Sequence, residues 1–390
     1  MKPLCSIKVL DLTDGNPYTA SMFADYGAEV LKIEKPDGGD SIRRRGAAEG
    51  EKEGLYQSFY NRGKKSMTLD ITKPAGQDII KRLVAKFDML IVNKTEKEMN
   101  ALGLGYEDLK ALNKKLIYGV LTPYGETGPW KDLPGYDLLI NSRCGLQEIT
   151  GMPEKPTKFG FPIAFVYSGW YLSAGMLAAY LNMLETGEGM KVAISIWHTM
   201  MSLDDKIAQC FLGLNELPKR IGNGFPTTNP TDTFKCKNGW FTLSIGSDQQ
   251  WISFARSAGR NDWAEDPRYA HDPARSMENY FGDLDQQLRD FFLEKTIEEA
   301  DMICREAMVP GGPCNTWKEL VADEQVADRQ MIIKVGDTTQ IGRAAKKKGE
   351  DISNETIQPA SALGADTAAY LNELGMSDGD INQLKAEGVI

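Results

Sequence analysis

Three basic side chains, Arg62, Lys64 and Lys65, lie almost next to one another in the segment 61–66. The protein as a whole is acidic, with a formal net charge of −10. In such a protein a basic cluster is where a phosphorylated ligand would bind, because guanidinium and ammonium groups pair well with phosphate oxygens. The alternative interpretation is a solvated run of surface charges.

A second candidate site is the turn at 11–17, with the sequence Asp-Leu-Thr-Asp-Gly-Asn-Pro. It follows the first predicted strand and leads into a helix, which is where a parallel α/β sheet holds a phosphate or a nucleotide. The turn lacks the GxGxxG pattern of dinucleotide-binding proteins. Asn16 is the candidate ligand-binding residue of this turn, and ordinary turn chemistry is the alternative.

The sequence contains few residues that could form a metal site, a Ser-His-Asp triad or a nucleic-acid-binding surface. Histidine occurs only at His198 and His271, so a His-rich metal site is not available and a Ser-His-Asp triad would need one of these two. The six cysteines are scattered without a CxxC pair, and we expect free thiols. The negative net charge disfavours non-specific nucleic-acid binding. We therefore expect neither a metal nor a nucleic acid.

The sequence shows no targeting or membrane signal. No signal-peptide pattern precedes the strand predicted at 7–12. The longest apolar run, at 176–184, is far shorter than the roughly 20 residues that span a bilayer. We expect a cytoplasmic protein without a membrane partner.

The elements that would position these residues alternate between strand and helix in the first half of the chain. The turn 11–17 would join the strand at 7–12 to a helix at 17–26. Further strands are expected at 30–34, 66–69, 89–92 and 116–121, and a further helix at 74–86. Alternating units of this kind predict an α/β fold, with a parallel sheet covered by helices in a Rossmann-like layer.

The second half of the chain has a different pattern. A long apolar helix with small residues is predicted at 170–184, and Asn238-Gly239 between two β-prone runs predicts a hairpin. Charged helical sequence follows at 249–306. We therefore predict a large Rossmann-like domain made from both chain ends, 1–225 and 326–390, and a smaller α+β domain at 226–325.

The segment 160–169, Gly-Phe-Pro-Ile-Ala-Phe-Val-Tyr-Ser-Gly, is followed by the apolar helix and by Glu-Thr-Gly-Glu-Gly at 185–189. This arrangement resembles the class III CoA-transferases, the formyl-CoA transferase and carnitine CoA-transferase family. Similar blocks occur in the same order along the whole chain, at 9–12, 24–36, 61–66, 90–94, 122–137 and 309–313. The resemblance implies an interlocked dimer in which each subunit threads the other.

The resemblance also implies coenzyme A or an acyl-CoA as substrate, together with a small carboxylic acid and no metal. In this family the block that matches 24–36 builds the CoA site, and Lys35 matches the basic residue that contacts the nucleotide phosphates. Lys64 matches the family's CoA-binding lysine. Asn93 matches a residue of the block 90–94, whose aromatic residue is replaced here by Lys94.

Tyr136 and Asp137 fall at positions that lie near the acyl thioester in relatives. The racemase branch of the superfamily has a histidine at the position of Tyr136, so racemase chemistry, which needs a pair of acid/base groups, is not expected. The closest overall similarity is to members that act on aryl or 2-hydroxy acids, such as benzylsuccinate and phenyllactate CoA-transferases.

Phe165 occupies the position at which this family has its nucleophilic aspartate. That aspartate forms a mixed anhydride with the acyl group, and an aromatic ring cannot do so. Three interpretations remain open, whether Phe165 is natural or engineered. The chain is a non-catalytic subunit, in a homodimer or a heterodimer with a homologous Asp-bearing subunit; or it is an active CoA-transferase that uses another carboxylate such as Asp137; or it is an acyl-CoA-binding or regulatory protein without turnover.

Overall fold

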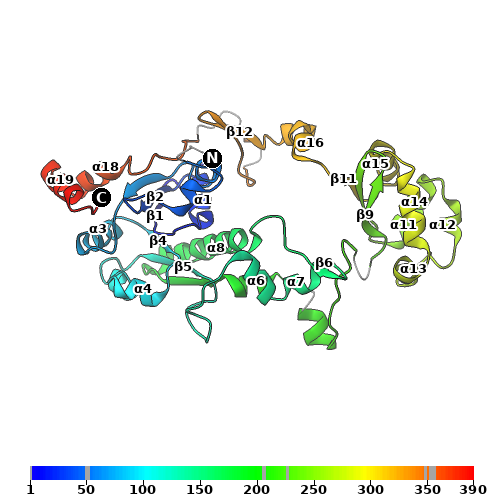
Figure 1. The fold of residues 1–390 in the computed structure, drawn as a ribbon, viewed down its shortest axis with the longest axis horizontal. Helices are drawn as coiled ribbons and strands as arrows, with labels where there is room; N and C mark the ends of the chain where they lie inside the picture. The colour runs from blue at the N-terminus through cyan, green and yellow to red at the C-terminus, as the bar shows by residue number, and fades with distance from the viewer. Residues whose placement is uncertain (1, 49–52, 204–207, 225–227, 347–348, 351–356) are drawn as a thin grey trace. The chain divides into compact units, whose positions relative to one another are not determined.

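A computed structural model describes residues 2–48, 53–203, 208–224, 228–346, 349–350 and 357–390. The chain divides into two compact units (Figure 1). Unit 1 comprises Met1–Leu146, Lys158–Glu216 and Gln325–Ile390, and unit 2 comprises Gln147–Thr157 and Leu217–Glu324. The sequence-based division did not place 147–157 with the smaller unit, and its boundary at 225–226 lies outside the described residues.

Unit 1 is built on a parallel six-stranded sheet with the strand order β3-β2-β1-β4-β5-β8. Its strands are β1 (Lys8–Asp11), β2 (Glu29–Glu34), β3 (Lys65–Thr68), β4 (Met89–Val92), β5 (Ile117–Thr122) and β8 (Lys191–Ser195). The strand order reverses between β1 and β4, and in open parallel sheets the loops at this point usually hold the ligand. The predicted Rossmann-like sheet is therefore confirmed.

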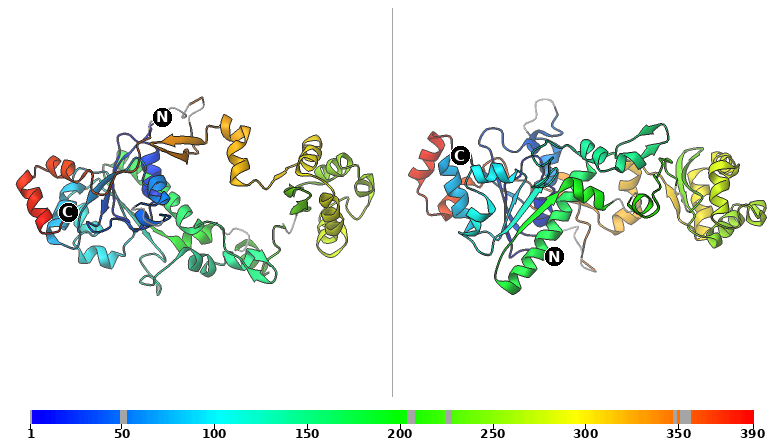
Figure 2. Two further views of the ribbon diagram at one scale, coloured as in Figure 1. Left: turned by 45° about the horizontal axis from the view of Figure 1, so that its top comes forward. Right: turned by 90° about the horizontal axis from the view of Figure 1, so that it is seen from below.

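Helices cover both faces of this sheet (Figures 1 and 2). One face carries α3 (Pro74–Val84), α4 (Glu96–Ala101), α5 (Tyr106–Lys110), α18 (Thr367–Glu373) and α19 (Asp378–Ala386). Leu10 of β1 and Leu371 of α18 belong to one buried apolar cluster, so the two ends of the chain share a core. The other face carries α1 (Tyr18–Asp25) and the long helix α8 (Ile163–Thr186), which packs along β5 and β8.

Shorter elements connect these layers. Those of unit 1 and its boundaries are η1 (Ser41–Arg44), α2 (Leu55–Tyr60), α6 (Asp137–Arg143), α7 (Leu146–Ile149), α9 (Ile196–Ser202), η2 (Ala208–Gly213), α17 (Glu324–Asp328), β12 (Ile332–Val335) and β13 (Thr338–Ile341). Within the described ranges, no helix combines the length and the apolar character needed to cross a membrane.

Unit 2 has an antiparallel sheet with the order β11-β10-β9. Its strands β9 (Thr231–Cys236) and β10 (Gly239–Ser244) form the hairpin predicted around Asn238-Gly239. Phe234, Phe241 and Phe292 stack at the centre of its core, with ring centroids 4.6 and 5.8 Å apart. The other elements are β6 (Gly151–Met152), β7 (Lys155–Pro156), β11 (Gly311–Pro313), α11 (Asp248–Ser257), α12 (Asn261–Glu265), α13 (Ala274–Phe281), α14 (Leu284–Leu293), α15 (Ile297–Ala307) and α16 (Trp317–Ala322).

Candidate functional site

Buried charges hold the turn that follows β1. Lys32 Nζ lies 2.7 Å from Asp40 Oδ2 and 3.4 Å from Asp11 Oδ1, and Lys64 Nζ lies 3.2 Å from Asp11 Oδ2. All four side chains are buried. Burial raises the pKa of Asp11, but the two ammonium groups outweigh it, so the pKa of this carboxyl is lowered. The turn is therefore fixed by ion pairs that reach it from β2 and from the start of β3.

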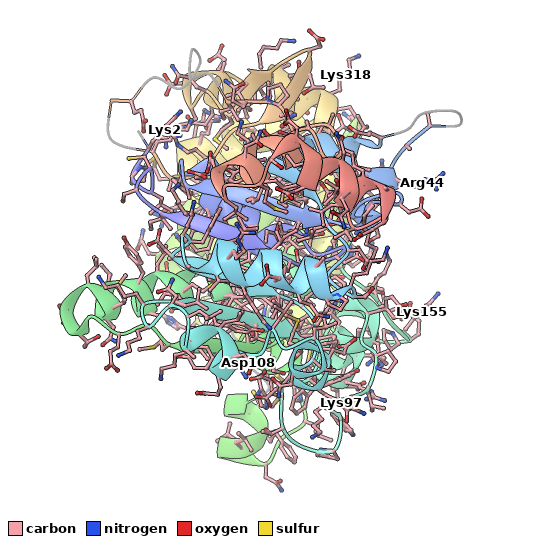
Figure 3. All side chains as sticks on the ribbon, turned by 90° about the vertical axis from the view of Figure 1, so that its left-hand side faces the viewer. Lys2, Arg44, Lys97, Asp108, Lys155 and Lys318 are labelled. Carbon is pink, nitrogen blue, oxygen red and sulfur yellow. The ribbon has the colours of Figure 1, made fainter. Side chains whose placement is uncertain are left out.

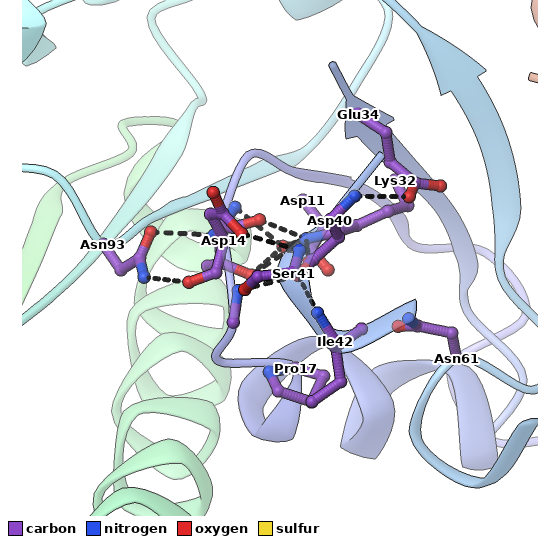
Figure 4. Close-up of polar contacts among 12 residues, drawn as sticks. Asp11, Asp14, Pro17, Lys32, Glu34, Asp40, Ser41, Ile42, Asn61 and Asn93 are labelled. Carbon is purple, nitrogen blue, oxygen red and sulfur yellow. Dashed lines mark hydrogen bonds and ion pairs between the residues drawn. The ribbon is translucent and has the colours of Figure 1, made fainter. Parts of the chain in front are cut away.

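Asn93, directly after β4, binds the same turn from the neighbouring strand. Its Oδ1 accepts a hydrogen bond from Asp14 N at 3.0 Å, and its Nδ2 donates to Asp14 O at 2.8 Å (Figure 4). The Asp14 carboxylate accepts from Lys35 Nζ and from Ser41 N, both at 2.9 Å. Lys35 and Asn93, which belong to separate blocks of the sequence, thus both bind the turn that contains Asn16.

A pocket of about 660 Å³ opens beside this turn, at the carboxyl ends of β1, β2 and β3. Its apolar wall comprises Leu12, Ile33, Leu69, Ile71, Ala101 and Leu102. Lys35 and Lys94 also line it, and Lys94 has no ion pair among the residues that the structure describes. Ligand pockets typically have volumes of roughly 300–1,000 Å³ and apolar walls with a few polar groups. Six carboxylates line the pocket as well, those of Asp14, Glu34, Asp37, Asp40, Asp70 and Glu98, and Lys35 is paired with the first of them. The size and the apolar wall fit the base of a nucleotide, and Lys94 is the lysine that is unpaired among the described residues and could meet a phosphate.

The basic cluster at 61–66 is dispersed in the structure. Arg62 forms a two-pronged ion pair with Asp25 at 2.7 and 2.8 Å, and Lys65 lies 3.3 Å from Asp366. Lys64 points into the buried network under the turn, where burial lowers its pKa. Each base has its own carboxylate partner, so the three do not form a joint phosphate site. The assignment of Lys64 to CoA binding stays a prediction.

Phe165 lies in the first turn of α8, and Asp137 caps that turn from the start of α6. Asp137 Oδ1 accepts hydrogen bonds from Ala164 N at 2.8 Å and from Phe165 N at 3.4 Å, while Oδ2 accepts from Asn141 Nδ2 at 3.0 Å. Burial raises the pKa of Asp137, and these hydrogen bonds oppose the rise. The carboxylate beside Phe165 is therefore already used as a helix cap.

The start predicted for this helix, at residue 170, was wrong. The helix begins at Ile163, and its N-cap residue Pro162 makes no side-chain hydrogen bond. Free N–H groups at a helix start need a partner, and here it comes from Asp137, 27 positions before Ala164. Local sequence before the helix therefore carries no capping signal.

Buried polar atoms without a partner gather on the helices around this turn. Among the described residues, Tyr18 Oη, Thr19 Oγ1, Asn141 Oδ1 and Ser168 Oγ have no hydrogen-bond partner. They belong to α1, α6 and α8, and both shorter helices contact α8. Such groups cost free energy unless a partner is bound, so this region has hydrogen-bonding capacity to offer a ligand. Tyr136, in contrast, is 73% exposed.

Lys32, Asp40 and the role of Lys94 were missed from the sequence. A signal for Lys32 did exist, because a lysine between apolar residues in a strand that is otherwise buried indicates an internal ion pair. Lys94 stands directly after Asn93, at the end of a wholly buried strand. Asp40 gave no signal, since it reaches the turn only through the fold. No group of three or more metal-ligating side chains was found in the described part of the chain.

Known proteins were compared with this chain by sequence and by structure. Residues 4–367 match the family model "CoA-transferase family III". A succinyl-CoA–D-citramalate CoA-transferase from Chloroflexus aurantiacus is 30% identical, with 100% of this chain and 98% of the relative covered. The beta subunit of a succinyl-CoA–L-malate CoA-transferase from the same organism is 28% identical, with the same shares covered.

A solved structure supports the same assignment. The crystal structure of a CaiB/BaiF family protein from Brucella suis superposes with a TM-score of 0.83 at 30% sequence identity, covering 95% of this chain and 99% of that one. Sequence and fold agree over nearly the full length of both proteins. The turn, the capped helix and the pocket lining other than Gly388 lie within residues 4–367. The chain belongs to CoA-transferase family III.

Proposed function

We propose that this chain is a subunit of a class III CoA-transferase that moves CoA between an acyl-CoA and a carboxylic acid, and that it has no nucleophile of its own. Its family supports the transfer of CoA groups. The observation that carries the proposal is the aromatic side chain of Phe165 in the capped first turn of α8. A benzyl side chain cannot form the acyl anhydride on which covalent transfer depends.

CoA would bind along the carboxyl edge of the sheet. The pocket beside the β1 turn would take the nucleotide, with Lys94 at its phosphates and Lys35 joining it by exchanging its partner Asp14 for a phosphate. Asn16 Oδ1 is buried and has no hydrogen-bond partner among the described residues, so it is available to a ligand. The thioester end would reach the start of α8, where unpaired polar groups gather.

The alternative is an active enzyme that uses Asp137 as nucleophile. Among the described residues, Asp137 is the only carboxylate hydrogen-bonded to the first turn of α8. Acylation of its Oδ1 would remove the negative charge that two helix N–H groups bind. Asp137 cannot act as a nucleophile and keep its full charge as the cap of α8 at the same time. We therefore favour the interpretation as a non-catalytic subunit.

A partner chain would then supply the aspartate. One relative is itself a beta subunit, which gives a precedent for two-chain members of the family. The names of two relatives include malate and citramalate, both 2-hydroxy acids, so we propose a 2-hydroxy acid or an aryl-succinate as acceptor. We therefore propose a heterodimer with a homologous Asp-bearing subunit.

Covalent trapping tests the missing nucleophile. The isolated chain, incubated with succinyl-CoA and then with hydroxylamine or borohydride, should keep its mass and should transfer no CoA to a panel of aryl and 2-hydroxy acids. The chain co-expressed with a homologous Asp-bearing subunit should transfer CoA. Robust transfer by the pure, unpaired chain would refute the proposal, and loss of that activity in Asp137→Ala would identify the substitute carboxylate.

Calorimetry tests the nucleotide site independently of turnover. Lys94→Ala should weaken CoA binding by about 1.5–3 kcal/mol, because a charge-assisted contact to phosphate is lost. Lys97→Ala removes the same charge from α4 outside the pocket and should leave the affinity unchanged. A chain that binds CoA but gains no activity with any homologous partner would instead be an acyl-CoA-binding or regulatory protein.

A further inference from the structure

Three tyrosines and one arginine of unit 1 form a cluster close to the start of α8. Tyr18 and Tyr60 meet edge to face with ring centroids 4.9 Å apart, and Tyr56 lies 5.9 Å from Tyr60. The guanidinium of Arg45 lies 4.7 Å from the centroid of the Tyr56 ring. Tyr18, Tyr56 and Tyr60 are called the tyrosine cluster below.

The backbone holds Arg45 against this cluster. Tyr56 N donates a hydrogen bond to Arg45 O at 3.4 Å. Gly46, with φ of +73°, lies so close that a Cβ on it would be 3.1 Å from Tyr56 Cδ2. Both the main chain and the stacked ring therefore fix where the guanidinium sits.

Arg45 has no carboxylate partner among the described residues, although the chain holds 55 acidic residues against 45 lysines and arginines. Arg43, two positions earlier, shows the contrast. It is buried and paired with Glu34 and Glu53 at 2.6 and 2.5 Å. Arg45 is exposed and stacked on Tyr56, and its guanidinium has no ion pair among the described residues, so it can bind an anionic ligand.

The tyrosine cluster connects Arg45 with the start of α8. Tyr18 packs on that helix so tightly that a Cβ on Gly169, one turn after Phe165, would be 2.6 Å from Tyr18 Cβ. Burial raises the pKa of Tyr18. The charge of Arg45 opposes this rise, and the charge of Asp137 adds to it. Through its ring contact with Tyr60 and its packing on Gly169, Tyr18 therefore links the tyrosine cluster with the helix that Asp137 caps.

We propose that Arg45 binds a second carboxylate at the far end of the acyl group, so that the acid handled by this enzyme is a dicarboxylic acid. This inference rests on the proposed function, which places the thioester at the start of α8. A guanidinium can bind a carboxylate through two parallel hydrogen bonds, and the rings of Tyr56 and Tyr60 offer apolar surface to the carbon chain. CoA itself does not need Arg45, which does not line the nucleotide pocket.

Two thioesters of equal acyl length test this role. Succinyl-CoA ends in a carboxylate, whereas butyryl-CoA ends in a methyl group. In calorimetric titrations the wild-type chain should bind succinyl-CoA roughly tenfold more tightly, or better, because a charge-assisted pair is gained. Arg45→Gln should abolish this preference and leave the butyryl-CoA affinity unchanged.

Arg44→Gln is the matched control. Arg44, which is labelled in Figure 3, is exposed. Its variant should keep the wild-type preference, while a preference retained by Arg45→Gln would overturn the inference. Equal affinity of the wild-type chain for both thioesters would also overturn it, without need of a folded variant. Failure to bind CoA or either thioester would refute the proposed function as well. Equal binding of the two thioesters would refute only the role of Arg45, so the two results can be told apart.

Discussion

Asp137 and Phe165 are neighbours in the structure because the first residue caps the helix that carries the second. The carboxylate satisfies two N–H groups at the start of α8 and interacts favourably with the positive end of the helix dipole. Phe165 takes part in this arrangement only through its main-chain N–H, so the cap does not depend on which side chain occupies position 165. The start of α8 is thus independent of whether residue 165 is a nucleophile.

Substitution of Asp137 should therefore reduce stability. Asp137→Ala should lower the free energy of unfolding by about 1–2 kcal/mol, because the cap is lost. Asp137→Asn should cost less, since the amide oxygen still accepts a hydrogen bond and the half-buried charge, whose pKa burial raises, is gone. Urea unfolding of the three proteins measures both differences. Equal stability of Asp137→Ala and wild type would show that the cap contributes nothing.

Among the elements, α1 and α8 approach each other at a glycine. Gly169 lies against the backbone of α1, where an added Cβ would be 2.6 Å from Tyr18 Cβ and 3.1 Å from Thr19 N. Glycine inside a helix normally costs roughly 0.5–1 kcal/mol relative to alanine. Glycine is nevertheless required at this position, because a residue with a Cβ would prevent the close approach of the two helices.

Gly169→Ala should consequently destabilise the protein by about 1–3 kcal/mol through overpacking. Gly175→Ala, on the same helix, is the comparison, because its Cβ would meet only Val192 Cγ1 at 3.1 Å. That variant should lie close to wild type, since a modest contact is offset by higher helix propensity. Thermal and urea unfolding will decide, and a Gly169→Ala chain as stable as Gly175→Ala would contradict the close approach.

The ion pairs at the carboxyl ends of β1 and β2 predict how stability depends on pH. Burial raises the pKa values of Asp11 and Glu34, but their cationic and hydrogen-bonding partners outweigh it and hold both below the usual 3.8 and 4.5. Their stabilisation is therefore complete above those usual values and is lost as the pH falls through them towards the lower folded-state values.

The free energy of unfolding should accordingly fall steeply between about pH 5 and pH 3. Urea titrations at fixed pH values measure the slope. Glu34→Gln should show a shallower slope than wild type, because one of the shifted carboxyls no longer titrates. A free energy of unfolding that stays constant over this interval would contradict the buried network.

The whole molecule exposes apolar side chains along α8 that a folded monomer would be expected to cover. Trp170, Leu181 and Leu184 are 51%, 64% and 61% exposed. Several exposed large apolar side chains on one helix are typical of interaction sites. It agrees with the interlocked dimer that the family resemblance predicts.

Sedimentation and solution scattering should find a dimer, and Leu181→Glu should shift it towards monomer because a charge would be buried at the contact. Asn182→Glu places the same charge one position along the helix, on a residue that is already exposed and polar. It should weaken association less. A compact wild-type monomer in solution would refute the interlocked dimer.

The amino-acid sequence determined what is local. Period, turn residues and apolar runs located five of the six strands of the parallel sheet, with 89–92 recovered as β4, and they located the Asn238-Gly239 hairpin in unit 2. The order of the short blocks gave the family. These features depend on residues that are close together in the chain, so they can be predicted from the sequence. The predicted domain bounds stay a prediction.

The tertiary structure alone decided which of the marked residues are free to act. Lys64 is engaged by Asp11, the start of α8 is set by Asp137, and Lys94 and Arg45 are left without ion-pair partners among the described residues. Each of these outcomes depends on which distant side chain the fold brings within a few ångströms. No local pattern encodes that proximity, and the energy of a charge depends on the partner it finds when buried.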